Sequence, residues 1–164
     1  HPDEVACKEL WMKAFGDDEQ FADSFIMRYY SRRRMLTAEA EGRMAAMLHL
    51  LPFRTELGRT TYIYGVATDP AFRGRGLASQ LMREAMRLIA ERGDDAAFLI
   101  PTPGKEWLRE FYGRFGFAGD VPARFVSADR FDFGTGDAAA DRAMVWRRDS
   151  SVPLPEQLTA SWRS

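Results

Sequence analysis

The sequence predicts an α/β protein of the α+β type, a single domain in which helices flank a central mixed sheet. The first observation is the order of the predicted elements: two helices, three strands, a helix, a strand, a helix and two strands. This order alternates too irregularly for a doubly wound parallel sheet. The second observation is a long helix between two apolar runs, which indicates a right-handed crossover and therefore one parallel pair in an otherwise antiparallel sheet.

Size and composition limit the possible functions. The chain has 164 residues and a net charge of −1, which suits one globular domain with its own core. A charge so close to zero gives no reason to expect nucleic acid or an anionic membrane as a partner. No apolar run approaches the roughly 20 residues that a membrane-spanning helix needs. Cys7 is the only cysteine, so an intramolecular disulfide is impossible, and a cytoplasmic location is expected.

The first thirty residues predict two helices. Asp3–Phe15 mixes apolar and charged residues at helical spacing, and Gly16 is expected to end it. Asp17 or Asp18 can cap the second helix. We interpret the large apolar side chains of this second helix mainly as core residues: Phe21, Phe25, Ile26, Tyr29 and Tyr30.

Two strands are expected next. Met35–Ala40 and Arg43–Phe53 are apolar runs on either side of Glu41-Gly42, a pair typical of a tight hairpin turn. Proline cannot donate to a strand ladder, so Pro52 is expected to mark an edge or the exit of the second strand. Thr55–Arg59 is predicted to be a polar loop that leads into the central strand.

The central segment passes from a strand through a glycine turn into the clearest helix of the chain. Tyr62–Thr68 is rich in β-branched and aromatic residues, and Pro70 should end this strand. Arg73–Gly76 places glycines where the backbone needs unusual angles or a close approach. The amphipathic helix begins at Leu77, directly after this turn, and Gly93 is placed to cap its end. The first N–H groups of such a helix attract anions, most commonly phosphate.

The remaining chain predicts four shorter elements and a closing arm. These elements are a strand, a helix and two strands, expected over Ala96–Ile100, Lys105–Phe115, Phe117–Ser127 and Ala143–Arg148. Residues 150–164 contain two prolines and show no clear period, so they are expected to form an arm or a tail beyond a domain of residues 3–149.

Two nucleotide-binding motifs fit the glycine turn poorly. A Walker loop needs lysine and then serine or threonine after its last glycine, where the chain has Leu77-Ala78. A dinucleotide fingerprint needs a glycine in the place of Ser79. It also needs an acidic residue after the second strand, whereas Asp94 and Asp95 precede that strand. A nucleotide-binding domain is kept as an alternative, which predicts that ATP or NAD stabilises the protein more than coenzyme A does.

Two segments resemble the GCN5-related N-acetyltransferase (GNAT) family. Val66–Ala78 is similar to its acetyl-CoA signature, whose core is Arg/Gln-x-x-Gly-x-Gly/Ala. The three defining positions are occupied by Arg73, Gly76 and Ala78. Phe111–Phe117 is similar to the family's Phe-Tyr-x-x-x-Gly-Phe at the usual distance downstream. The resemblance implies a three-layer acyl-CoA N-acyltransferase fold, whose central strands splay apart to admit the pantetheine arm of acetyl-CoA.

The same resemblance implies a function, namely transfer of an acetyl group from acetyl-CoA to a primary amine by direct attack in a ternary complex. The backbones of Val66 and Thr68 would pair with the pantetheine amides, and the Val66 N–H would stabilise the developing oxyanion. The amides from Gly74 to Ser79 would hold the pyrophosphate, while Arg73 and Arg75 add charge or lie in solvent. The implied cofactor-binding residues are Val66, Ala67, Thr68, Arg73, Gly74, Arg75, Gly76, Leu77, Ala78 and Ser79.

Acyl transfer also needs a proton for the leaving thiolate and a neutral amine. By its place in the family motif Tyr112 is the predicted general acid, since a phenol with a pKa of about 10 keeps its proton at neutral pH. The alternative is a core tyrosine that donates to a carbonyl. His49 and Glu56 are candidate bases, although a lone histidine among apolar residues is more often structural. A water relay, or an amine that arrives neutral, would serve as well.

The expected partner is an amine acceptor, either a small molecule or a protein, and we predict no metal, nucleic-acid or membrane site. The resemblance implies that the two N-terminal helices form one wall of the acceptor pocket. Homodimers are common in such families, so a homodimer is an alternative to a monomer. The competing function is a catalytically idle acyl-CoA-binding module that acts as a sensor or an interaction domain.

Overall fold

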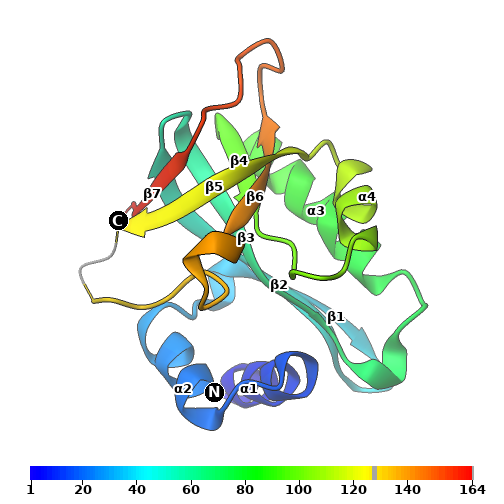
Figure 1. Cartoon of the computed structure of the whole chain (residues 1–164). Helices are drawn as coiled ribbons and strands as arrows, with labels where there is room; N and C mark the ends of the chain where they lie inside the picture. Colours follow the sequence, from blue (N-terminus) through cyan, green and yellow to red (C-terminus); the bar gives the residue numbers. More distant parts are fainter. Residues whose placement is uncertain (127–128, 164) are drawn as a thin grey trace. The chain divides into compact units, whose positions relative to one another are not determined.

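A computed structural model describes residues 1–126 and 129–163 of the chain, so the predicted strand end at Ser127 and the arm's last residue, Ser164, lie outside the described residues. Figure 1 shows the arrangement of its elements along the sequence. The α-helices are α1 (Pro2–Phe15), α2 (Glu19–Arg28), α3 (Leu77–Glu91) and α4 (Trp107–Gly113). The strands are β1 (Met35–Ala40), β2 (Arg43–Thr55), β3 (Gly58–Thr68), β4 (Ala96–Leu99), β5 (Ala118–Val126), β6 (Arg142–Arg147) and β7 (Leu158–Trp162).

The strands form a mixed seven-stranded sheet in the order β1-β2-β3-β4-β6-β5-β7. β3 pairs in parallel with β4, and β5 pairs in parallel with β7. The pairs β1–β2, β4–β6 and β5–β6 are antiparallel. The predicted mixed sheet is therefore confirmed, including the parallel pair that α3 connects.

The chain divides into two compact units. The first unit comprises residues 1–50 and 64–85, and the second comprises residues 51–63 and 86–164. β2, β3 and α3 each contribute residues to both units.

The first unit contains the two N-terminal helices and the β1–β2 hairpin, all close to their predicted bounds. Gly16 ends α1 in the left-handed conformation with φ 65°, and the Asp18 side chain caps α2 by accepting a hydrogen bond from the Phe21 N–H at 2.7 Å. Glu41 and Gly42 have φ 53° and 76°, as a two-residue turn between antiparallel strands requires. The core of this unit is formed by the buried residues Cys7, Leu10, Trp11, Ala22, Phe25 and Ala45–Leu48.

In the second unit, the predicted polar loop of Thr55–Arg59 is wrong. β2 continues to Thr55 and β3 begins at Gly58, so only two residues separate the strands. The hydroxyl groups of Thr55 and Thr60 are 2.9 Å apart across this hairpin. Gly58 has φ 105°, which a residue with a side chain rarely adopts. This local geometry explains how a polar segment forms a tight turn.

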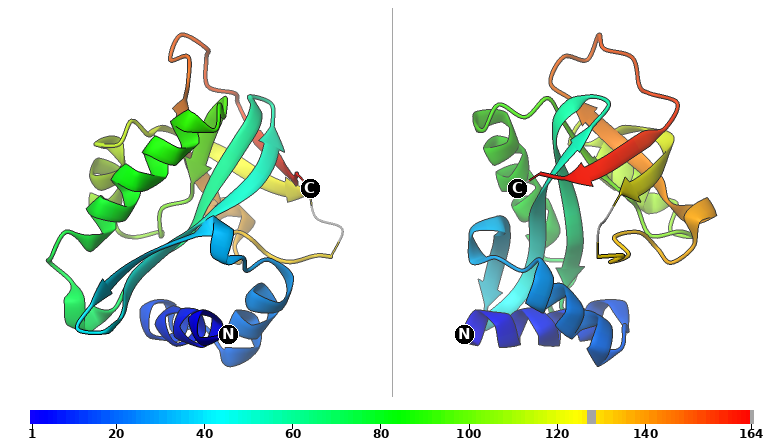
Figure 2. Two further views of the ribbon diagram at one scale, coloured as in Figure 1. Left: turned by 180° about the vertical axis from the view of Figure 1, so that it is seen from behind. Right: turned by 90° about the vertical axis from the view of Figure 1, so that its left-hand side faces the viewer.

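The closing segment is not a separate tail, because it contains β7. This strand pairs with β5 on one side and, at Phe53 and Arg54, antiparallel with β2 on the other. Figure 2 shows β7 in red beside the yellow β5. Pro52 is not a strand exit, since its carbonyl accepts a hydrogen bond from the Arg163 N–H at 2.9 Å. Within the second unit the strands therefore close into a ring from β2 through β3, β4, β6, β5 and β7.

An aromatic cluster fills one face of the second unit. It consists of Phe53, Tyr62, Phe98, Phe125, Phe133 and Trp162. Tyr62 stacks on Phe98 with ring centroids 4.5 Å apart, and its hydroxyl donates to the Phe133 carbonyl oxygen at 2.7 Å. Phe133, in the segment between β5 and β6, is 2% exposed. Burying aromatic rings of this size is a major source of the stability of a small domain.

Candidate functional site

The glycine turn lies in the first unit, directly before α3. Gly74 and Gly76 have φ 79° and 75°, and a Cβ atom at either position would meet no atom within 4 Å. The backbone angle, not a lack of space, therefore calls for glycine here. The first helical hydrogen bond runs from the Gln80 N–H to the Gly76 carbonyl at 3.0 Å. The amides of Leu77, Ala78 and Ser79 precede it and have no acceptor within the helix. This arrangement can bind an anion.

Phe72 anchors the turn to the first unit. Its ring is 1% exposed and belongs to a short 3-10 helix, Pro70–Phe72. The guanidinium groups of Arg43 and Arg75 lie 4.7 Å and 4.9 Å from its centroid. Arg75 thus packs on an aromatic ring by a cation–π contact. Arg73 is exposed, in agreement with its alternative reading as a solvent-facing residue.

Asp69 fixes the segment between β3 and the turn, a role that the sequence analysis did not consider. Its carboxylate accepts a hydrogen bond from the Ala71 N–H at 2.9 Å, and its own N–H donates to the Ala45 carbonyl at 2.8 Å. Lys13 lies 3.5 Å from the same carboxylate. The Ala71 N–H and, less strongly, the Lys13 charge lower the pKa of Asp69. The Asp-Pro pair at residues 69–70 is the sequence signal for this capped turn.

The end of β3 carries the residues predicted to contact pantetheine. β3 pairs with β4 at Thr60, Thr61 and Tyr62 and then continues to Thr68. Ala67 is buried, while Val66 and Thr68 are half-buried. Strand backbone beyond its ladder has N–H and C=O groups that can pair with a ligand.

Gly65 shapes this part of β3. Its φ is 64°, and a Cβ atom there would lie 2.8 Å from the Trp11 ring and 3.0 Å from the His49 ring. Both the backbone angle and the packing therefore require glycine before Val66.

Tyr112 lies on α4, in the second unit. Its side chain is 7% exposed, and burial raises the pKa of its hydroxyl to about 12. The Tyr62 hydroxyl, by contrast, donates to the Phe133 carbonyl oxygen at 2.7 Å. A phenol with a raised pKa keeps its proton at neutral pH and can donate it.

His49 has the environment of a packed side chain. It is fully buried, and desolvation, reinforced by the charge of Arg34, lowers its pKa to about 3. Its ring lies 5.0 Å from that of Phe25, and its Nε2 is 3.8 Å from the Cys7 Sγ. Burial raises the pKa of the Cys7 thiol to about 12, so the two groups are neutral and do not form a thiolate–imidazolium pair. Such a weakly basic imidazole does not suit a general base.

Glu56, the other candidate base, has a structural role in the second unit. Both of its carboxylate oxygens accept a hydrogen bond from the Thr159 N–H, at 2.7 Å and 3.0 Å. This contact ties β7 to the turn between β2 and β3. The implied cofactor-binding residues all lie in the first unit, whereas Tyr112 and Glu56 lie in the second.

Within residues 1–126 and 129–163, no three His, Cys, Asp or Glu side chains gather so that they could hold a metal ion. Of the helices in these ranges, none combines the length and the apolar character that crossing a membrane requires.

Comparison with known proteins gives a consistent family and fold. The sequence model of the acetyltransferase (GNAT) domain matches residues 2–119. The Escherichia coli GNAT family N-acetyltransferase YhbS, solved in complex with CoA, has a TM-score of 0.68 and 18% identity, with 99% of this chain and 86% of that chain covered. A GNAT family acetyltransferase from Brucella melitensis, solved in complex with acetyl-CoA, has a TM-score of 0.64 and 16% identity, with coverages of 99% and 91%. Among curated proteins, no sequence matches the chain.

Proposed function

The chain belongs to the GNAT acetyltransferase family, and from this premise we propose that it transfers the acetyl group of acetyl-CoA to a primary amine of a small molecule or a protein. The observation that carries the proposal is the glycine turn at the start of α3, with amides that have no acceptor within the helix. The complexes of the Escherichia coli and Brucella melitensis proteins with CoA and acetyl-CoA support the choice of cofactor. The second candidate function, an idle acyl-CoA-binding module, shares this turn but needs no general acid.

In the proposed reaction the backbone of the first unit holds the cofactor. The amides from Gly74 to Ser79 bind the pyrophosphate, since several N–H groups at a helix start stabilise negative charge. The backbones of Val66 and Thr68 pair with the pantetheine amides, because β3 runs beyond its ladder with β4. The Val66 N–H donates to the thioester oxygen as negative charge develops there.

The proposed acyl transfer is balanced by two proton movements. The amine nitrogen forms a bond to the thioester carbonyl carbon, and the carbon–sulfur bond breaks. Tyr112 gives its hydroxyl proton to the departing thiolate, and the amine nitrogen loses one proton. We assign no protein base to this second step, because His49 is fully buried with a pKa of about 3. The amine therefore reacts in its neutral form, its nitrogen releases one proton to water after the attack, and Tyr112 recovers its proton from water.

Replacement of Tyr112 by phenylalanine tests the proposed function. We expect kcat for a panel of primary amines to fall about 100-fold or more, as removal of a general acid does, while the Kd of coenzyme A changes less than about twofold. If acetyl-CoA raises the melting temperature but no amine is acetylated, the idle binding module is correct. If ATP or NAD stabilises the protein more than coenzyme A does, both acyl-CoA hypotheses are wrong.

A further inference from the structure

Four arginines from separate elements of the second unit interact electrostatically, and one of them is in contact with a buried carboxylate. They are Arg54 of β2, Arg59 of β3, Arg92 directly after α3, and Arg163 directly after β7. We call them the arginine cluster. The carboxylate is that of Asp94, which has no exposed surface. The proposed acyl transfer uses none of these residues.

The strand ladders place Arg54 and Arg163 on the same face of the sheet. Phe53 and Trp162 pair across β2 and β7, and their rings lie 5.6 Å apart within the aromatic cluster. Successive side chains of a strand point to opposite faces, so the neighbours Arg54 and Arg163 lie on the other face. The bond from the Arg163 N–H to the Pro52 carbonyl makes the two arginines diagonal neighbours across this ladder.

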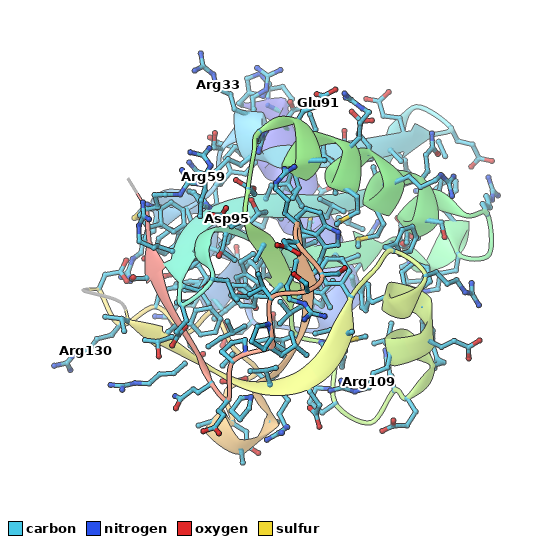
Figure 3. All side chains as sticks on the ribbon, turned by 90° about the horizontal axis from the view of Figure 1, so that it is seen from above. Arg33, Arg59, Glu91, Asp95, Arg109 and Arg130 are labelled. Atoms are coloured by element: carbon cyan, nitrogen blue, oxygen red, sulfur yellow. The ribbon has the colours of Figure 1, made fainter. Side chains whose placement is uncertain are left out.

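Asp94 does not neutralise the cluster. One of its carboxylate oxygens accepts from Arg59 Nε at 2.8 Å, and the other accepts from the Thr61 hydroxyl at 2.5 Å. Asp95, labelled with Arg59 in Figure 3, uses its carboxylate to accept from the Arg59 N–H at 2.9 Å. Neither carboxylate forms an ion pair with Arg163 in the described part of the chain.

Arg163 is a cluster member with an unpaired side-chain donor. Its Nε is buried and has no hydrogen-bond partner among the described residues. Burial lowers its pKa, and so do the charges of Arg59, Arg54 and Arg92, against which only Asp94 acts. A buried donor without a partner costs free energy, and like charges held together repel. Both costs are removed when an anion binds.

We propose that the arginine cluster binds a phosphate group, at a site built from other residues than the glycine turn. Guanidinium groups donate pairs of parallel N–H bonds that match phosphate oxygens, and several cations favour a dianion over a single carboxylate. The phosphate is either free or part of a small phosphomonoester. This proposal stands whether or not the chain is an acetyltransferase.

Calorimetric titration of the whole chain tests the site. The probes are inorganic phosphate and glycerol 3-phosphate, at ionic strength matched with chloride. We expect phosphate to bind, and Arg163→Gln and Arg92→Gln each to weaken its Kd about tenfold through loss of charge-assisted bonds. Arg92 is exposed, so its variant is expected to fold even where Arg163→Gln does not. Arg130→Gln, at an exposed arginine outside the cluster (Figure 3), should leave the Kd unchanged.

Three outcomes would overturn the proposal. The first is no heat with either probe. The second is binding that Arg92→Gln and Arg163→Gln leave as strong as in the natural sequence. The third is loss of phosphate binding when coenzyme A saturates the protein, which would place the phosphate at the glycine turn. A short single-stranded RNA that binds while both small probes fail would likewise replace this site by a nucleic-acid surface. Tighter binding of glycerol 3-phosphate than of phosphate supports a phosphomonoester as the ligand.

Discussion

His49 in the first unit and Asp94 in the second are both fully buried polar residues, but they are accommodated in opposite ways. His49 packs among aromatic rings, and its Nδ1 has no hydrogen-bond partner among the described residues. Asp94 is in an ion pair with Arg59 and also accepts a hydrogen bond from Thr61. His49 can stay buried without a partner for its Nδ1 only while its ring is neutral. The charged Asp94 can stay buried only while its hydrogen-bond and ion-pair partners are present. The two units should therefore respond to different perturbations.

The largest expected effect on stability comes from removing the buried Asp94 carboxylate in the second unit. Asp94→Ala leaves Arg59 and Thr61 without their acceptor, and breaking a buried ion pair in this way costs about 4 kcal/mol of unfolding free energy. Urea denaturation measures it. Asp149→Ala is the control, since that exposed carboxylate bonds only locally, to Ser151 at 2.6 Å, and should cost much less. Similar losses in both variants would show that the Asp94 network contributes little.

The packing around His49 should tolerate no added atom. Gly65→Ala places a Cβ atom 2.8 Å from Trp11 and also strains a backbone with φ 64°. We expect a loss of about 3 kcal/mol from the combined strain and overpacking. Gly16→Ala has nearly the same φ, 65°, but no atom within 4 Å of the new Cβ, so it should lose only about 1 kcal/mol. Equal losses would mean that the backbone angle alone matters.

Acid should destabilise the first unit through His49. Its pKa is about 3 in the folded protein and about 6.5 when unfolded, so below pH 6.5 the unfolded state binds the extra proton. The stability from neutral His49 is thus complete above pH 6.5 and is lost as the pH falls toward 3. Between pH 6 and 4 we expect the natural sequence to lose about 2 kcal/mol more than His49→Gln does. A pH dependence that His49→Gln does not reduce, or that His1→Gln reduces equally, would contradict this assignment.

The smallest expected effect on stability is that of removing the hydroxyl group of Tyr62 or of Tyr112. Tyr62→Phe leaves the buried Phe133 carbonyl without its donor and should cost about 1 kcal/mol in chemical denaturation. Tyr112→Phe removes the hydroxyl of the proposed general acid and should change stability by less than about 0.5 kcal/mol. If Tyr112→Phe is the more destabilising variant, the Tyr112 hydroxyl has a structural role instead of the proposed catalytic one.

Elements whose signals are local could be predicted from the sequence. Gly16, Asp18 and the Glu41-Gly42 turn each act on neighbouring residues, so α1, α2 and the β1–β2 hairpin were found near their bounds. β7 could not be predicted, because its pairings with β5 and with the distant β2 exist only in the folded chain. The turn before β3 was missed because the sequence of Thr55–Arg59 is mostly polar and its glycine, Gly58, follows the two turn residues.

In the candidate site, too, local features could be predicted from the sequence and side-chain environments could not. Glycine at positions 74 and 76 indicates unusual backbone angles, so the turn at the start of α3 could be predicted. The environment of a side chain depends on residues far apart in sequence. That His49 is packed against Phe25, and that Tyr112 is only 7% exposed, could be learned only from the structure.

The position of β7 has a practical consequence for anyone who shortens this protein. Because the segment after residue 149 resembles a dispensable tail, it is an obvious target for removal. A chain cut before Leu158 would uncover backbone on both β5 and the end of β2. Exposed strand edges can pair with strands of other chains. The trimmed protein would therefore be prone to aggregate, whereas the intact protein keeps these edges covered.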